Sequence, residues 1–273
     1  MGDFTKFGRA ELKGWSEPET AKAYAEGFAS AAEQCVADIV EVSHVAQGSV
    51  ALDVCCGQGS VAKGLSTAGA HVTGLDFSPA MLEIACREVP TVNFVEGDAS
   101  SLPFEDDSFD AVTMGFGILH IPDAEAAIRE AKRVLRPGGR FVYSVWQAPD
   151  KSPAFRIVFG AIEKFGSKEV SLPPGPPLHA FASPEYAYPV LEAAGFTEAR
   201  MRSSNSVWTV SSPRTPYDYF REGTVRGALL LRSQPAENAS AIRDAIEKAV
   251  LEEFGSDAPW IIPIPAAIVS ATA

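Results

Sequence analysis

The stretch Ala51-Leu-Asp-Val-Cys-Cys-Gly-Gln-Gly-Ser60 joins an apolar run to a turn that contains two glycines. The apolar residues within Ser49–Val54 predict a short buried strand, and Gly57-Gln-Gly59 predicts the turn that ends it. The next residues, Ser60–Ala68, are typical of a helix, and Gly69 is a suitable stop for it. A strand, a glycine turn and a helix in this order predict the first unit of an α/β fold.

The same alternation continues as far as Trp146. Further strands are expected over His71–Leu75, Val92–Val95, Phe109–Met114 and Arg140–Trp146. Helices are expected over Pro79–Glu88 and Asp123–Leu135, the second closed by the turn Pro137-Gly-Gly139. Strands that alternate with helices imply right-handed crossovers and a parallel sheet. The sequence therefore predicts a doubly wound, mostly parallel α/β fold that binds ligands at the carboxyl ends of its strands.

The regions on either side of this core have a different character. Residues 1–47 are expected to be helical, with the apolar residues of Glu19–Val42 spaced for one helix face. The segment Ala148–Pro184 is rich in proline and aromatic residues, which predicts a cover of loops and helix. Beyond it, the expected elements are a helix over Pro184–Ala194, one or two extended segments in Phe196–Val210, mostly helix over Ser212–Phe254, and a last apolar strand over Trp260–Ala271.

The charge and composition of the 273 residues exclude several classes of function. The net charge is −12 and the lysines and arginines are scattered, which disfavours nucleic acid and anionic membranes as partners. No apolar run reaches the roughly 18–20 residues that span a bilayer, and the first residues lack the pattern of a signal peptide. We expect a soluble cytoplasmic protein, without membrane insertion, that is a monomer or a homodimer.

The cysteines and the acidic run are not typical of a metal site. Cys35, Cys55, Cys56 and Cys86 show no Cys-x-x-Cys or Cys/His spacing, so buried reduced thiols are expected and no metal. Neither Cys55 nor Cys56 has a visible partner base, so core packing is favoured over a nucleophilic role. The run Glu105-Asp-Asp107 is expected to be a solvated turn.

Three aspartates fall at the carboxyl ends of successive strands. Asp53, Asp76 and Asp98 are separated by 23 and 22 residues, one strand–helix unit each. Gly57 and Gly59 let the backbone approach a ligand where a side chain would clash. Asp76 is placed to accept hydrogen bonds from ribose hydroxyls, and Asp98 with Ala99 is placed to meet an adenine ring. A single Gly-x-Gly is a weak signal, but its register with the three aspartates makes the combination strong.

These motifs together resemble those of class I S-adenosylmethionine-dependent methyltransferases of the ubiquinone/menaquinone-biosynthesis type, also called methyltransferase type 11. The resemblance covers roughly residues 48–146. It lies in Ala51–Ser60, in Gly74-Leu-Asp-Phe-Ser-Pro-Ala-Met-Leu82, in Gly97-Asp-Ala-Ser-Ser-Leu-Pro-Phe104, and in Phe109-Asp-Ala-Val112 with Arg133-Val-Leu-Arg-Pro-Gly-Gly-Arg-Phe141. One departure is Cys55, where the family often has glycine.

The resemblance implies a seven-stranded Rossmann-like sheet with a final antiparallel strand, which Trp260–Ala271 could supply. It implies S-adenosylmethionine as the methyl donor and S-adenosylhomocysteine as the product. Because no linker convincingly divides the chain, we also expect a single structural domain in three parts: an N-terminal helical cap (1–47), a donor-binding core (48–147), and substrate-cover insertions with the last helices and strands (148–273). The residues expected to contact the donor are Tyr24, Asp53, Gly57, Gln58, Gly59, Asp76, Phe77, Met81, Asp98, Ala99 and Gly115.

The acceptor is less well defined by the sequence. Methyl transfer depends mainly on holding the acceptor against the donor, and a base is needed only if the acceptor must lose a proton. His120 is the candidate base, although a packing histidine is the favoured interpretation. Aromatic residues near the cover predict a small, partly apolar acceptor whose methylated atom is oxygen, nitrogen or carbon. The residues expected to form its pocket are Trp15, Phe28, Phe116, Trp146, Phe155, His179, Phe181 and Tyr219.

Two alternative functions stay open at this point. Gly57-x-Gly59-x-x-Ala62 followed by Asp76 also fits a loose fingerprint of NAD(P)-dependent oxidoreductases. Against it, Asp53 and Asp98 are not required by that fingerprint, and no Tyr-x-x-x-Lys pair occurs. The second alternative is a protein that binds the methyl donor but does not transfer its methyl group.

Overall fold

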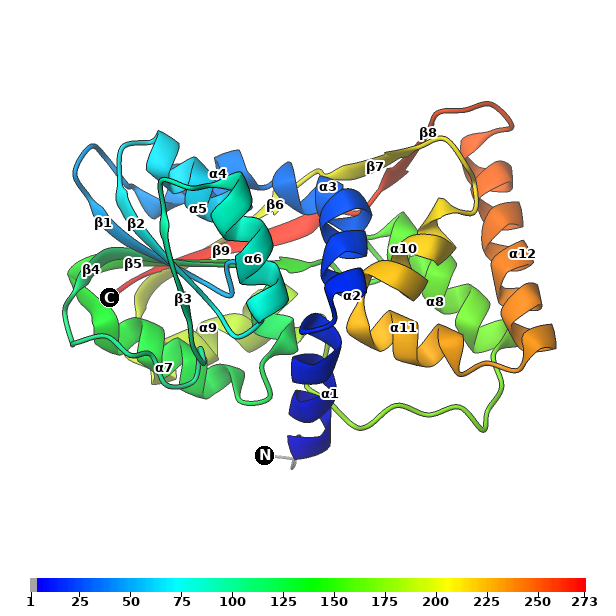
Figure 1. Ribbon diagram of the computed structural model, residues 1–273, viewed down its shortest axis with the longest axis horizontal. Helices are drawn as coiled ribbons and strands as arrows, with labels where there is room; N and C mark the ends of the chain where they lie inside the picture. The colour runs from blue at the N-terminus through cyan, green and yellow to red at the C-terminus, as the bar shows by residue number, and fades with distance from the viewer. Residues whose placement is uncertain (1–3) are drawn as a thin grey trace.

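The computed structural model describes residues 4–273, and its centre is a seven-stranded sheet (Figure 1). The strand order is β3-β2-β1-β4-β5-β9-β6. The pairs from β3 to β5 are parallel, whereas β9 runs antiparallel to both β5 and β6. The strands are β1 (Val50–Val54), β2 (His71–Asp76), β3 (Asn93–Glu96), β4 (Phe109–Gly115), β5 (Leu135–Trp146), β6 (Thr197–Ser204) and β9 (Ala266–Thr272). The predicted doubly wound, mostly parallel sheet is confirmed.

Helices cover both faces of this sheet, α4 and α5 on one and α7 and α9 on the other (Figure 1). Two of the crossover helices begin with a side-chain cap. Ser78 accepts a hydrogen bond from the Met81 N–H at 3.1 Å, and Asp123 accepts one from the Ala126 N–H at 2.9 Å. The bounds are α4 (Val36–Ser43), α5 (Ser60–Thr67), α6 (Pro79–Glu88), α7 (Ala124–Val134) and α9 (Pro184–Ala193).

The remaining helices form a group beside the sheet, with α1, α2 and α3 at the centre of the view and α8, α10, α11 and α12 at its right (Figure 1). Within this group the N-terminal helices lie nearest the sheet, because α2 contacts both α10 and the crossover helix α6. A two-stranded antiparallel sheet, β7 (Val207–Val210) with β8 (Trp260–Pro263), also belongs to the group. Its helices are α1 (Thr5–Trp15), α2 (Pro18–Ala23), the π-helical η1 (Tyr24–Phe28), α3 (Ala29–Glu33), α8 (Pro153–Phe165), α10 (Thr215–Gly223), α11 (Val225–Arg232) and α12 (Ala236–Phe254). Two 3-10 turns are η2 (Ile118–His120) and η3 (Ala180–Ala182).

The expectation of one last strand over Trp260–Ala271 is wrong. The segment divides into β8, which pairs with β7, and β9, which enters the main sheet. Pro263 and Pro265 have no N–H to donate to a ladder. Between them the Ile264 N–H donates to the Ser206 carbonyl, and the Pro265 carbonyl accepts from Gln147. The chain therefore changes partner strand at this point, although β9 still supplies the expected antiparallel strand.

The helical stretch expected over Glu19–Val42 consists of several helices. The structure has α2, η1 and α3 in succession, then a turn at residues 34–35 before α4. The Gln34 side chain is occupied outside the helix, since its amide donates to the Val207 carbonyl and its oxygen accepts from the Val207 N–H. This pairing with β7 fixes the turn between α3 and α4.

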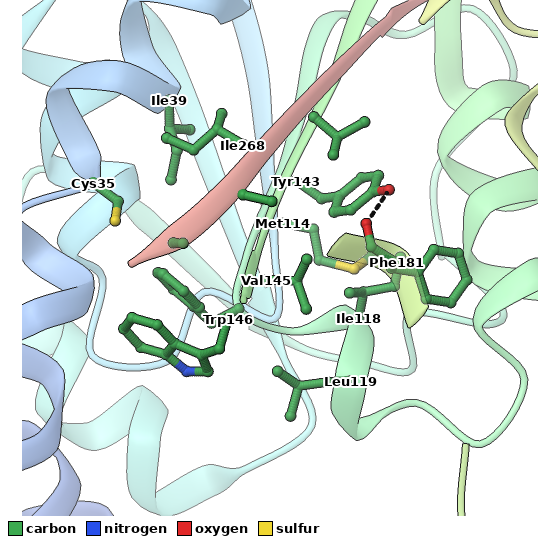
Figure 2. Close-up of a cluster of buried hydrophobic side chains, with 14 of the residues drawn as sticks. Cys35, Ile39, Met114, Ile118, Leu119, Tyr143, Val145, Trp146, Phe181 and Ile268 are labelled. Atoms are coloured by element: carbon green, nitrogen blue, oxygen red, sulfur yellow. Dashed lines mark hydrogen bonds between the residues drawn. The ribbon is translucent and has the colours of Figure 1, made fainter. Parts of the chain in front are cut away.

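The main core continues from the sheet to η3, whose Phe181 packs near Tyr143 of β5 (Figure 2). Met114, Tyr143 and Val145 are fully buried, and the Tyr143 hydroxyl donates to the Phe181 carbonyl at 3.1 Å. A buried phenol needs such a partner, so this bond holds η3 against β5.

The structure also bears on membrane insertion and on the burial of the cysteines. Within residues 4–273, no helix is long and apolar enough to cross a membrane. Cys35 and Cys56 are buried and Cys55 is partly buried, but Cys86 is exposed, contrary to the expectation of four buried thiols. Cys86 follows the buried Ala85 by one position on α6 and therefore lies on its outer face.

Asp110 at the start of β4 ties three strands together and generates a prediction about pH. Its carboxylate accepts from the Val50 N–H at 2.8 Å and from Arg136 at 2.6 Å, and these bonds hold its pKa below the ordinary value. We expect Asp110→Asn to lower the free energy of unfolding at neutral pH by about 1 kcal/mol or less, because the site is partly exposed. A depressed carboxyl pKa stabilises the fold above the unfolded value of about 3.9 and ceases to do so as pH falls through the folded value.

Urea unfolding measured from neutral to acidic pH checks this expectation. The difference between wild type and variant should be present at neutrality and should be lost as pH falls through the depressed pKa of Asp110. Asp257→Asn, at an exposed position outside these bonds, is the matched control and should change little at any pH. A difference that grows on acidification would contradict the assignment.

Candidate functional site

The loop that follows β1 opens onto the carboxyl edge of the sheet. Cys55, Gly57 and Gly59 all have positive φ, at 54°, 53° and 87°. A Cβ on Gly57 would meet nothing within 4 Å, whereas one on Gly59 would lie 3.1 Å from Phe94 and 3.2 Å from Val89. The two predicted glycines therefore differ: Gly57 leaves the backbone open to a ligand, and Gly59 permits close packing behind it.

Asp76 ends β2 directly opposite this loop. One carboxylate oxygen accepts from the Gly57 N–H and the other from the Ser78 N–H, each at 2.9 Å. Asp76 is buried, and its burial raises its pKa above the ordinary value although both hydrogen bonds act in the opposite direction. The carboxylate thus fixes the loop and remains on the wall of a cavity.

This strand-end cavity lies between the loop, α6 and the N-terminal helices. Among residues 4–273 its wall includes two acidic side chains, Glu33 and Asp76, so it offers negative charge to a ligand. Its free volume is about 90 Å³. The sequence-predicted residues that line it are Trp15, Tyr24, Gly57, Gln58, Asp76, Phe77, Met81, Gly115, Phe116 and His120.

Asp53, Asp98 and Ala99 lie near the cavity but not on its wall. Asp53 is fully buried; its Oδ1 accepts from the Thr113 hydroxyl at 2.8 Å, and within residues 4–273 its Oδ2 has no partner. Burial raises the pKa of Asp53 to about 7. The Asp98 carboxylate accepts from the Ser100 N–H at 2.8 Å, and Ala99 is buried. Their predicted contacts with a donor stay predictions.

A second cavity, of about 340 Å³, adjoins the first and is mainly aromatic. Its size falls in the usual range for small-molecule pockets. We call it the aromatic cavity. The predicted residues on its wall are Trp15, Tyr24, Phe28, Phe116, His120, Trp146 and Phe155. Those that the sequence analysis missed include Phe159 and Ile162 from α8, Leu172, Pro176 and Leu178 from the loop after it, and Val225, Arg226 and Leu230 from α11.

The two cavities share the side chains of Trp15, Tyr24, Phe116 and His120. The Trp15 ring stands edge-on to both Tyr24 and His120, with ring centres 5.3 and 5.1 Å apart. Phe116 stacks on Trp146 at 4.0 Å. A ligand in the first cavity and a ligand in the second would therefore meet at a boundary made of these four residues.

Three predicted acceptor residues lie away from the aromatic cavity. His179 binds the Trp146 carbonyl through Nδ1 at 3.0 Å and packs on Phe155, and burial lowers its pKa. Phe181 packs in the core near Tyr143 and borders a surface groove. Tyr219 stands edge-on to Trp208 and packs against Gly27. His179 thus supports the cavity-lining Phe155 from behind, whereas Phe181 and Tyr219 pack against residues of the core.

Arg226 brings a positive charge to the mainly apolar wall. It is half-buried on α11, stacks over the Phe7 ring at 5.2 Å, and donates to the Pro173 carbonyl at 3.3 Å. Desolvation lowers its pKa below the ordinary arginine value. No carboxylate of residues 4–273 lies within ion-pair distance of it.

Glu11 is the most important residue that the sequence analysis missed. It is 2% exposed on α1, and its Oε2 accepts from Trp15 Nε1 at 3.0 Å and lies 2.8 Å from His120 Nδ1. The signal was present in the sequence. Phe7, Glu11 and Trp15 repeat at intervals of four and share the buried face of the helix, where a carboxylate is unexpected.

The thiols beside the loop have no feature of a nucleophile. Burial raises the pKa of both Cys55 and Cys56 well above the ordinary value. No group of three or more His, Cys, Asp or Glu side chains in the described part of the chain is placed to hold a metal ion.

The comparisons with known proteins agree with this geometry. Residues 52–143 match the family model described as methyltransferase domain. The demethylmenaquinone methyltransferase of Staphylococcus haemolyticus is 46% identical over 133 residues, which cover 46% of this chain and 55% of that protein. The chain thus spans about half the length of the curated relatives it matches.

Solved structures share the fold over most of the chain. The YcgJ protein of Bacillus subtilis superposes with a TM-score of 0.59 at 21% identity and covers 87% of this chain and 97% of its own. The cyclase SpnF superposes with a TM-score of 0.52 at 23% identity, over 88% of this chain and 80% of its own. At these identities the likeness concerns the fold alone.

The sheet, the glycine loop and Asp76 have the arrangement of a Rossmann-like methyltransferase fold. Residues 52–143 are the part of the chain that matches the methyltransferase domain family.

Gly117 leaves the space that the Cys55 side chain occupies, and this dependence can be tested. A Cβ on Gly117 would lie 2.4 Å from the Cys55 Cβ and 2.8 Å from its Sγ. We expect Gly117→Ala to lower the free energy of unfolding by about 1–3 kcal/mol, as overpacking does. In a Cys55→Gly background the two contacts with Cys55 are removed and the contact with Met114 Cγ at 3.0 Å stays, so less than half of this loss should remain.

Chemical denaturation of the four proteins measures this coupling. Gly160→Ala is the matched control, because it lies exposed on α8 with nothing within 4 Å of its added Cβ. It should raise the free energy of unfolding by up to about 1 kcal/mol. An equal loss for Gly117→Ala in both backgrounds would exclude the coupling.

Proposed function

We propose that the protein is an S-adenosylmethionine-dependent methyltransferase that acts on a small, partly apolar acceptor. The observation that carries the proposal is the pair of adjoining cavities that share Trp15, Tyr24, Phe116 and His120. One has the loop and acidic residue that a nucleoside ligand requires, and the other has an aromatic wall. We extend the proposal to a single structural domain, a cytoplasmic location and a monomeric or homodimeric state.

The residues of the strand-end cavity suit the donor. The open backbone at Gly57 gives room for close approach, and the Asp76 carboxylate is placed for ribose hydroxyls. Glu33 and Asp76 provide negative charge, which favours a ligand that carries a positively charged sulfonium and an ammonium group. When bound, the donor supplies an electrophilic methyl group. We propose that Asp98 and Ala99 contact the adenine, and that Asp53 supports the loop from behind.

The residues of the chain would hold the acceptor in position against the donor and exclude water from both. Holding two reactants in line can supply up to about 7–11 kcal/mol of the barrier reduction. The aromatic side chains Phe116, Trp146 and Phe155 would hold a flat apolar ring against the boundary of the two cavities. Relatives are named for the methylation of demethylmenaquinone, which supports an acceptor of quinol or phenol type. Arg226 would face an electron-rich edge of that ring.

Asp76 provides the sharpest test of the donor site. We expect Asp76→Ala to weaken binding of S-adenosylhomocysteine at least tenfold, because the ribose acceptor and the anchor of the Gly57 loop are lost together. Isothermal titration calorimetry measures the affinity directly. Asp257→Ala, at an exposed position away from the cavity, is the control and should leave the affinity unchanged.

The same measurements separate the alternative functions. Stabilisation of the wild type by S-adenosylhomocysteine but not by NADH in a thermal shift assay supports the donor site over a dinucleotide site. Unchanged affinity in Asp76→Ala would show that the donor lies elsewhere. Donor binding without methyl transfer to any of a panel of phenols, quinols and amines would favour the non-methylating alternative.

Two neighbouring leucines on α11 test the acceptor cavity. Leu230 lines the aromatic cavity, whereas Leu229 is 41% exposed and lies outside it. We expect Leu230→Ser to weaken binding of 1-naphthol roughly three- to tenfold, since apolar contact area is lost. Leu229→Ser should leave the affinity within twofold of wild type. Quenching of tryptophan fluorescence, to which Trp146 contributes, reports the binding. Equal affinities in the two variants would place the apolar ligand elsewhere.

A further inference from the structure

Glu11, Trp15 and His120 form a hydrogen-bonded group at the boundary of the two cavities. Glu11 Oε2 lies 2.8 Å from His120 Nδ1 and 3.0 Å from Trp15 Nε1. The carboxylate is 2% exposed, while His120 lines both cavities. The group therefore joins a buried anion to an imidazole at the point where donor and acceptor would meet.

With Glu11 ionised, its contact with His120 would determine which imidazole nitrogen carries the proton. An ionised carboxylate only accepts hydrogen bonds, so His120 Nδ1 must be the donor in its contact with Glu11. In the neutral ring Nε2 is then left without a proton. Nε2 has no hydrogen-bond partner within residues 4–273, and it is not among the buried polar atoms that lack one. It is therefore free to accept a proton from a ligand.

We propose that Glu11 and His120 act as a dyad that removes a proton from a hydroxyl group of the acceptor. The acceptor would then belong to the class of phenols or enols. This inference rests on the proposed methyltransferase function. The acceptor O–H bond breaks, its proton passes to His120 Nε2, and its electron pair stays on oxygen to form the bond to the methyl carbon. The electron pair of the broken carbon–sulfur bond stays on sulfur, and the imidazolium later returns its proton to water.

The proposed proton transfer accounts for the burial of the Glu11 carboxylate. Glu11 Oε1 is buried without a hydrogen-bond partner in the described part of the chain, which is costly for an anion. Once His120 is protonated, Glu11 and His120 form a hydrogen-bonded ion pair. The free-energy cost of burying the Glu11 carboxylate therefore falls as the proton is transferred. His120 touches the acceptor and is the catalytic residue; Glu11 acts through it and is a positioning residue.

A second contact predicts the effect of removing Glu11. Trp15 Nε1 also lies 3.4 Å from His120 Nδ1. In Glu11→Leu this N–H would donate to Nδ1, which must then carry no proton, and the proton would move to Nε2. Leucine keeps the apolar packing of the α1 face and removes a buried charge, so the variant is expected to fold. Glu11→Gln keeps an acceptor for Nδ1–H but loses the charge.

The tautomer of His120 tests the dyad without an acceptor. Nitrogen-15 NMR of histidine-labelled protein with S-adenosylhomocysteine, at about pH 8 where a free imidazole is neutral, distinguishes the two forms. We expect Nδ1–H in the wild type and in Glu11→Gln, and Nε2–H in Glu11→Leu. Glu19→Gln, an exposed position on α2, is the control and should match the wild type. An Nε2–H tautomer in the wild type, or no change in Glu11→Leu, overturns the proposal.

The kinetic arm uses phenols, naphthols and their amine analogues as acceptors. General-base catalysis predicts that His120→Gln and Glu11→Leu each lower kcat for hydroxyl acceptors about a hundredfold or more, with Glu11→Gln intermediate. The double variant should be no slower than His120→Gln, because the residues act as a unit. Hydroxyl methylation at the wild-type rate in His120→Gln, or turnover of amine acceptors alone, overturns the dyad while the methyltransferase proposal stands. Failure of the wild type to bind S-adenosylhomocysteine would instead refute the proposed function.

Discussion

The hydrogen bonds at the tip of β2 are the constraint on which both cavities depend. Asp76 holds the Gly57 N–H with one oxygen and the Ser78 N–H with the other. Ser78 in turn caps α6 and donates its hydroxyl to the Trp15 carbonyl at 2.6 Å. One aspartate and one serine therefore connect the glycine loop, the helix after β2 and the end of α1. Because Trp15 also contacts Glu11 and His120, the geometry of the base follows from that of the donor loop.

This arrangement places carboxylates where burial opposes their ionisation. Burial raises the pKa of both Asp53 and Asp76, and Asp53 and Glu11 each keep one buried oxygen without a partner within residues 4–273. Such groups cost stability, and perturbed or unsatisfied groups tend to gather at functional sites. A positively charged donor beside them would offset part of this cost, as would an imidazolium beside Glu11. Asp76 and Glu11 thus share one rationale, because each would favour positive charge close to the boundary of the cavities.

The sequence predicted the sheet because its signals are local. Each strand–helix unit between Val50 and Trp146 carries its own apolar run and turn, so Gly57 and Asp76 could be placed at the strand ends without long-range information. The distinction between Gly57 and Gly59 could not be predicted, because it depends on Phe94 and Val89, which lie far along the chain from the loop. The division of Trp260–Ala271 depends likewise on which strands are adjacent.

The aromatic cavity was harder to predict for the same physical reason. Its wall comes from α1, η1, β5, α8, α10 and α11, which meet only through packing between segments far apart in the chain. An aromatic side chain in such a segment has no local signal that separates a cavity wall from a core, as His179, Phe181 and Tyr219 illustrate. Glu11 is the exception, because a carboxylate on an apolar helix face contradicts the pattern around it. A charge that violates an amphipathic pattern therefore points to the hydrogen-bonded group at the boundary of the cavities more directly than the aromatic residues that surround it.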